Sequence, residues 1–165
     1  MYLACCTRPD IAQSVGVLGR FMAEPRKPHL VAAKHVLRYL AGTRTLGIRY
    51  GAGKPGLVIY SDSDYAGELE HRRSTTGYVV LMDGAAVSWS SRIQPTTATS
   101  TQEAEYMALG GSIREALSMR KTFSDFNLDV PVMDIRSDNT SAISLAHNPM
   151  GRSTLMCSIT LPGTG

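Results

Sequence analysis

Apolar residues recur at helical spacing through the first part of the chain. Intervals of three and four between them predict a helix over residues 7–24, with Thr7 as its cap and Pro9 in its first turn. The prolines of residues 25–28 end that helix, and a second amphipathic helix is predicted over residues 29–40. Two such helices with a short connection predict a helical hairpin.

From residue 57 onward the apolar runs become short and rich in β-forming residues. Turn residues separate them, and Asp83-Gly84 between the second and third runs is a strong hairpin signal. Residues 43–56 contain four glycines and a proline, which predicts a linker or a loose hairpin between the helical part and the β-rich part. The predicted strands are 57–62, 77–82, 85–90 and 133–137.

Two further helices are predicted within the β-rich part. Ser100 and Glu103 form a capping box, and helical spacing follows to about residue 123. A shorter helix is predicted over residues 140–147, ended by Asn148-Pro149. The order β, β, β, α, β, α predicts an α/β fold: a mixed sheet with flanking helices and a right-handed crossover between the third and fourth strands.

Three carboxylates stand where this topology would bring them together. Asp62 and Asp138 stand where the first and fourth predicted strands end, and in open α/β sheets binding sites gather at the carboxyl ends of strands. Ordinary turn chemistry is the alternative explanation for either residue alone. Glu105 lies at the edge of the apolar stripe predicted for the long helix, where a carboxylate needs a partner or a metal ion, whereas the capping box accounts for Glu103. The predicted stripe comprises Tyr106, Leu109, Ile113, Ala116 and Leu117.

Carboxylates without a Cys or His cluster favour a hard cation with oxygen ligands. Mg²⁺ (or Mn²⁺) is the candidate, because it binds through a few carboxylates together with water and phosphate oxygens. Two such ions, about 3.5–4 Å apart, would support in-line phosphodiester cleavage.

Charge is distributed unevenly along the chain. Residues 1–50 carry eight Lys/Arg and two acids, whereas the remainder carries nine bases and twelve acids. A basic arm, with Lys34 and Arg38 on one helix face, indicates a polyanion partner; solvated helix faces are the alternative explanation. No apolar run has the length of a membrane span, the start has no secretory signal, and three unpaired cysteines favour a reducing interior. We therefore expect an intracellular protein, cytoplasmic or nuclear.

Three segments of the β-rich part, YSDSDYAG, STQEAEY and SDNTSAI, resemble the ribonuclease H domain of copia-type LTR retrotransposons. They occur here in the order that the family has them, with Tyr65 for its usual Trp and Ser137 for its usual Cys. The resemblance implies an RNase H-like fold and hydrolysis of the RNA strand of RNA–DNA hybrids. It also implies that Asp62, Glu105 and Asp138 are the metal-binding acids, with Asp64 a weaker candidate in a turn or behind the ligands.

The same resemblance gives a domain organisation. Residues 1–45 resemble the end of a reverse transcriptase, without its catalytic acids, so the reverse transcriptase portion of a polyprotein is an expected partner. Residues 46–56 are the expected linker and residues 57–149 the ribonuclease H-like domain. Lys34 and Arg38, together with Arg72 and Arg73 after the first strand, are the expected contacts to nucleic acid; for the arginine pair a solvated loop is the alternative.

The resemblance fails at residues 150–165. No acid follows Asp138, so the fourth metal-site acid of the family and the end of its fold, the last strand and helix, are expected to be missing. Residues 152–165 can be written as DNA with a suitable choice of synonymous codons. When that DNA is read again from the third base of each codon, it encodes a segment close to the family's ending. We infer a frameshift between about Pro149 and Ser153, which sequencing of the encoding DNA tests, and expect little or no cleavage.

Three other interpretations stay open. The chain is either a non-catalytic nucleic-acid-binding remnant, a truncated reading frame without selected function, or another metal-dependent nuclease or integrase of the same fold. Soluble expression with a cooperative melt separates the first two. A Glu on the central helix followed by a strand-end Asp favours ribonuclease H over the third.

Overall fold

The computed structural model describes residues 1–53, 55–68, 72–129, 132–140, 143–144 and 157–160. The chain forms two compact units, Met1–Arg49 and Tyr50–Gly165. The boundary between the two units falls within residues 46–56, the segment predicted to be a linker. In the described part of the chain, no helix combines the length and the apolar character that crossing a membrane requires.

The first unit is helical, but its first predicted helix is wrong in outline. Residues 7–24 are not one helix, and Thr7 ends α1 instead of capping the helix after it. Proline disfavours helical backbone in the residue before it, and Arg8 is accordingly extended, with φ −131° and ψ 78°. The second predicted helix is confirmed as α3. The elements are α1 (Tyr2–Cys6), a 3₁₀ turn (Pro9–Ile11), α2 (Ala12–Arg20) and α3 (Lys27–Gly42).

A polar network ties the 3₁₀ turn to the end of α3. The Arg8 guanidinium donates to the Asp10 carboxylate, at 2.7 Å for its shortest bond, and also to the carbonyl and hydroxyl oxygens of Thr43. The Tyr39 hydroxyl donates to the same carboxylate at 2.8 Å. The Arg8 bond above all holds the pKa of Asp10 at about 2.

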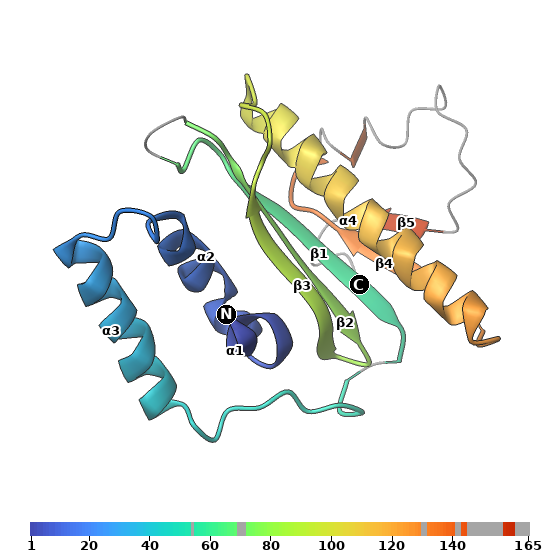
Figure 1. Cartoon of the computed structure of the whole chain (residues 1–165). Coiled ribbons are helices and arrows are strands. Elements are labelled where there is room, and N and C mark those ends of the chain that lie inside the picture. The colour runs from blue at the N-terminus through green and yellow to red at the C-terminus, as the bar shows by residue number, and fades with distance from the viewer. Residues whose placement is uncertain (54, 69–71, 130–131, 141–142, 145–156, 161–165) are drawn as a thin grey trace. The chain divides into compact units, whose positions relative to one another are not determined.

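The second unit is a five-stranded mixed sheet in the order β3-β2-β1-β4-β5, with α4 lying across one face (Figure 1). β1 pairs antiparallel with β2 and parallel with β4, and β2 pairs antiparallel with β3. The predicted α/β fold, a mixed sheet with flanking helices and a helical segment before it, is confirmed. The strands are β1 (Leu57–Asp64), β2 (Thr75–Met82), β3 (Ala85–Ile93), β4 (Met133–Arg136) and β5 (Cys157–Thr160), and α4 spans Thr101–Asp125.

The fifth strand corrects one expectation. We expected the sheet to lack its last strand, yet β5 pairs in parallel with β4, with Met133 opposite Cys157 and Arg136 opposite Thr160. The sequence of β5, Cys-Ser-Ile-Thr, alternates between apolar and polar residue types, and its last two residues are β-branched. Such a sequence is compatible with a strand even though residues 150–165 do not resemble the family. The predicted helix over 140–147 is helical at Thr140 and at 143–144; its other residues lie outside the described part.

The β2–β3 hairpin turns as its sequence predicts. Asp83 and Gly84 both have positive φ, +50° and +82°, as a two-residue hairpin turn of the favoured hand requires. Part of the predicted linker packs on this turn: the N–H of Gly53 donates to the Asp83 carbonyl at 2.9 Å, and the N–H of Gly56 to the Asp83 carboxylate at 3.0 Å.

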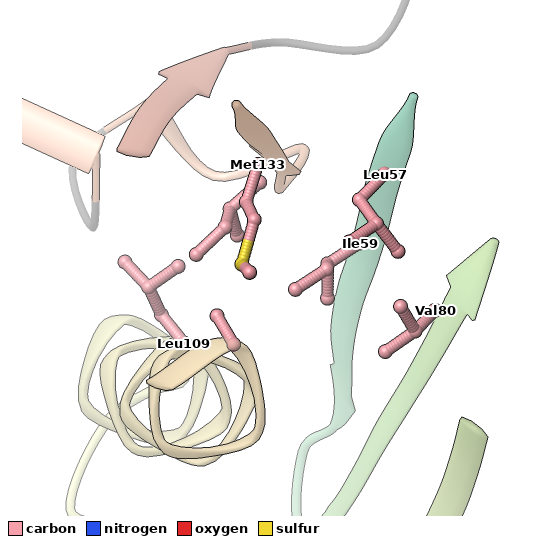
Figure 2. Packing of buried hydrophobic residues seen from close by; sticks show 7 residues of the cluster. Leu57, Ile59, Val80, Leu109 and Met133 are labelled. Carbon is pink, nitrogen blue, oxygen red and sulfur yellow. The ribbon is translucent and has the colours of Figure 1, made fainter. Parts of the chain in front are cut away.

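The core lies between the sheet and α4. Leu57 and Ile59 of β1, Val80 of β2 and Met133 of β4 point toward Leu109 of α4 (Figure 2). The predicted capping box is present, because the Ser100 hydroxyl accepts from the N–H of Glu103 at 3.1 Å. The Glu103 carboxylate reaches back to the N–H and the hydroxyl of Thr99.

The buried face of α4 differs from the predicted stripe. Tyr106 and Leu117 are 46% and 39% exposed, whereas the small residues Ala108 and Ser112 are fully buried. Leu109 and Ala116 of the predicted stripe are buried as expected. Small side chains allow the helix to lie close to the sheet, so its contact line also includes alanine and serine. Glu105 follows the buried Ala104 near the start of α4 and is itself half-buried.

Candidate metal centre

The register between β1 and β4 brings the two aspartates side by side. These strands are parallel, and Tyr60 is paired with Arg136. Asp62 and Asp138 each stand two residues further along the chain, so both emerge at the same edge of the sheet. Asp62 is still within β1, opposite Gly77 of β2, whereas Asp138 lies in the bend after β4. Both side chains are exposed.

Glu105 completes the group from above the sheet. Asp62, Glu105 and Asp138 each offer a carboxylate oxygen, and these three oxygens all lie within 4.8 Å of one another. In the described residues, this is the one group of three or more His, Cys, Asp or Glu side chains with such a spacing. The three acids selected from the sequence thus converge, and a single divalent cation could contact all of them.

Glu105 has the most unusual environment of the three. Its Oε1 accepts a hydrogen bond from the Ser63 hydroxyl at 2.8 Å, whereas its Oε2 is buried and has no hydrogen-bond partner among the described residues. Burial is the main cause of the raised pKa of Glu105; the Ser63 bond opposes it, and the negative charges of Asp62 and Asp138 add to it. A half-buried glutamate that has one oxygen without a partner among the described residues, grouped with two other carboxylates, is the arrangement that a cation would stabilise.

Asp64 does not join this group. Its carboxylate lies against Gly67, where a Cβ would have no room, and Ala66 between them has a φ of +52°. This fits the expected turn role of Asp64 and gives a reason for the glycine in the segment YSDSDYAG.

Two features near the site had not been singled out from the sequence. Ser63 contacts both Asp62 and Glu105. Tyr60 and Arg136 form a cross-strand pair, with the guanidinium 5.6 Å from the ring centre and a 3.2 Å bond to the hydroxyl. The sequence could have pointed to this pair, because Tyr60 and Arg136 each stand two residues before a candidate acid.

The predicted nucleic-acid contacts lie on exposed or half-exposed elements. Lys34 and Arg38 are exposed on α3, in the first unit. Arg72 is exposed with a φ of +54°, and Arg73 is half-buried, in the loop between β1 and β2. Their role in binding stays a prediction.

Comparison with known proteins gives a consistent set of relatives. No protein-family model matches the chain. The retrovirus-related Pol polyprotein from transposon TNT 1-94 of Nicotiana tabacum is 41% identical over 150 residues, which are 91% of this chain and 11% of that protein. The secreted RxLR effector protein 161 of Plasmopara viticola is 50% identical over 118 residues, 71% of this chain and 83% of that protein.

Among solved structures, an RNase H1 isolated from compost aligns with a TM-score of 0.43 and 17% identity, over 66% of this chain and 84% of that one. The chain spans only about a ninth of the tobacco polyprotein, so the activities of such a whole polyprotein do not transfer to it by similarity.

Proposed function

Because the chain belongs to the retrovirus-related Pol polyproteins of copia-type transposons, we propose that its second unit is a metal-dependent ribonuclease H module. The proposed reaction is hydrolysis of the RNA strand of an RNA–DNA hybrid. The observation that carries the proposal is the approach of three carboxylate oxygens, from Asp62, Glu105 and Asp138, to within 4.8 Å of one another.

The donor set fits a hard divalent cation. All three donors are carboxylate oxygens, and Oε2 of Glu105, which has no partner in the described part of the chain, offers a ligand position. Asp62, Glu105 and Asp138 would hold Mg²⁺ or Mn²⁺. When bound, such ions supply an activated water and stabilise the leaving oxygen of a phosphodiester.

The chain's own residues prepare the site in two ways. The exposed Asp62 and Asp138 leave the sheet edge open to a duplex backbone, while the half-buried Glu105 closes the site on the side of α4. In the proposed complex, Arg72 and Arg73 beside the β1 end, and Lys34 and Arg38 on α3, contact phosphates. Such contacts would make binding weaken steeply with salt.

We also propose that this chain cleaves weakly. Residues 139–165 contain no Asp or Glu, so they supply no fourth acid. Losing one carboxylate ligand weakens an ion's site, because too few oxygens replace its water. Within this proposal, residues 1–45 are a reverse-transcriptase end, 46–56 a linker, 57–149 the ribonuclease H-like domain, and 150–165 a frameshifted tail. The module would act inside the cell, beside the remainder of a polyprotein.

The missing fourth acid also favours a second candidate function, that of a non-catalytic remnant that binds an RNA–DNA hybrid or a duplex. A cleavage assay decides between the two. A labelled RNA–DNA hybrid is incubated with Mg²⁺ or Mn²⁺ and either this chain or a chain whose reading frame is restored after about Pro149. We expect little product from the first and clear product from the second.

Matched variants make the assay specific. In the frame-restored chain, Asp62→Asn should abolish cleavage, whereas Asp125→Asn, an exposed acid at the end of α4, should leave it unchanged. A frame-restored chain that binds hybrid without cutting it would favour the remnant. Robust turnover by the unaltered chain would contradict the proposed need for a fourth acid.

A further inference from the structure

Ser63 links two of the three acids through two separate atoms. Its backbone N–H donates to Oδ1 of Asp62 at 2.8 Å, and its side-chain hydroxyl donates to Oε1 of Glu105 at 2.8 Å. The first bond comes from the backbone and would exist with any residue except proline at this position. The second bond depends on the serine side chain alone.

The hydroxyl bond determines which oxygen of Glu105 remains available. Oε1 is engaged by Ser63, and Oε2 is buried without a hydrogen-bond partner among the described residues. A glutamate side chain has three rotatable bonds, so an unrestrained carboxylate would sample several orientations. Fixing Oε1 to the strand leaves Oε2 as the oxygen that can face an ion shared with the two aspartates.

We propose that Ser63 is the positioning residue of this metal site, acting on the ion through Glu105. The inference rests on the proposed function, because it presupposes that the three acids bind a divalent cation. Partners that orient a metal ligand typically change metal affinity by about 10- to 100-fold when they are removed. Since Ser63 orients one ligand of three, we expect a change near the lower end, roughly tenfold.

A competing account makes the opposite prediction. The Ser63–Glu105 bond could merely satisfy Glu105 while no cation is bound, and the carboxylate would then leave Ser63 when the ion arrives. Removing the hydroxyl would in that case leave metal affinity unchanged or increase it, because no bond would have to be broken first.

Three variants separate these accounts. Ser63→Ala removes the hydroxyl but keeps the backbone bond to Asp62. Ser63→Thr keeps a hydroxyl on a β-branched residue that suits a strand. Ser90→Ala removes a half-buried serine of β3, outside the acidic group, and serves as the matched control.

The experiment is a calorimetric titration of the full chain with MnCl₂, with no nucleic acid present, alongside a thermal melt of each variant in EDTA. We expect Ser63→Ala to weaken Mn²⁺ binding about tenfold, with Ser63→Thr and Ser90→Ala within twofold of the wild type. Wild-type affinity in Ser63→Ala, or no recovery in Ser63→Thr when both melt like the wild type, would overturn the inference.

Asp62→Asn distinguishes this failure from failure of the proposed function. If the wild type binds Mn²⁺, Asp62→Asn does not, and Ser63→Ala equals the wild type, only the role of Ser63 is wrong. If the wild type binds no Mn²⁺, or Asp62→Asn binds it equally well, the metal site and the role of Ser63 fail together. A Ser63→Ala chain that does not fold leaves Ser63→Thr to decide, since a positioning role requires it to bind as the wild type does.

Discussion

The side-chain amide of Gln94 donates to the backbone carbonyl of Ala104 at 2.9 Å, one residue before Glu105. The same amide nitrogen donates to the Thr76 hydroxyl at 3.0 Å, and the Gln94 side chain is only 2% exposed. A buried polar side chain thus joins the start of α4 to β2. The position of Glu105 above the sheet edge depends on this junction as well as on the helix cap.

Replacing Gln94 should loosen that junction. Gln94→Met keeps the side-chain length but leaves the Thr76 hydroxyl without its donor, so we expect a loss of about 1–2 kcal/mol in the free energy of unfolding. Urea unfolding followed by circular dichroism measures it. Gln102→Met, at an exposed position of α4, is the control and should change stability by less than about 0.5 kcal/mol. Equal stability of the two variants would show that the junction contributes little.

We expect the ionised carboxylate of Glu105 to destabilise the metal-free protein, although it is proposed as a metal ligand. Its pKa is raised, mainly by burial, so the folded state holds this proton more tightly than the unfolded state. The resulting stabilisation is complete below the ordinary value of 4.5 and is lost as pH rises through the raised pKa. In EDTA at pH 7, Glu105→Gln should therefore melt higher than the wild type, by about 2 °C for an effect of roughly 0.5–1 kcal/mol.

Glu103, two residues before Glu105, serves as a control, because its replacement should change the melting temperature in the opposite direction. Its pKa is lowered, chiefly by the hydrogen bond from the Thr99 side chain. Its stabilisation is present above 4.5 and is lost as pH falls through the lowered pKa, so Glu103→Gln should melt lower at pH 7. Added Mg²⁺ should raise the melting temperature of the wild type and of Glu103→Gln but not of Glu105→Gln. The same shift in all three proteins would argue against Glu105 as a ligand.

The first unit should depend on the ionised carboxylate of Asp10. Its pKa of about 2, against an ordinary 3.8, means that its stabilisation is present above pH 3.8 and is lost as pH falls toward 2. Asp10→Asn should lower the stability of this unit at pH 7 by about 1 kcal/mol, a size that allows for solvent screening. The gap from the wild type should narrow below pH 3.8. Hydrogen exchange of the α3 amides at pH 7 and acid titration of the helical signal would measure both effects.

Glu24 provides the comparison for Asp10. It forms an ion pair with Arg26 in which both side chains are largely exposed, so Glu24→Gln should leave stability nearly unchanged. If Glu24→Gln and Asp10→Asn had equal effects, the network around Arg8 would have no special role.

Gly53 should not tolerate a side chain. A Cβ there would lie 2.5 Å from the carbonyl oxygen of Asp83 and equally near the Cα of Gly84, both backbone atoms of the hairpin turn. Gly53→Ala should therefore lower the melting temperature by several degrees, for a loss of about 1–3 kcal/mol. Gly47→Ala is the control, because nothing lies within 4 Å of its Cβ position. An unchanged melt for Gly53→Ala would mean that the contact between this part of the predicted linker, residues 46–56, and the hairpin turn contributes little to stability.

The sequence predicted the convergence of the three acids more accurately than the bounds of the elements that carry them. Asp62 and Asp138 could be paired in advance because each stands at the end of a predicted strand, and parallel strands align their carboxyl ends. The role of Glu103 could also be assigned, since the spacing from Ser100 defines a capping box. These features are local, and local patterns can be recognised along a single sequence.

The features that could not be predicted depend on contacts between distant residues. The buried face of α4 passes through Ala108 and Ser112 because the helix lies close to the sheet, and no periodicity of large apolar residues reports that distance. The helix α2 ends at Arg20, before the predicted end at residue 24, and the next residue, Phe21, stacks on His29 of α3 with 4.0 Å between the ring centres. This contact too joins residues of different elements. The pairing of β5 with β4 is a third case, because the composition of a four-residue strand does not indicate which strand it will pair with.

The central claim is that Asp62, Glu105 and Asp138 share a divalent cation. Anomalous diffraction from crystals grown with MnCl₂ tests it most directly. We predict a manganese peak bounded by one oxygen from each of the three carboxylates, with Oε2 of Glu105 as the ligand from α4. A map without a peak at this sheet edge, or one in which Glu105 turns away from the two aspartates, would contradict the account.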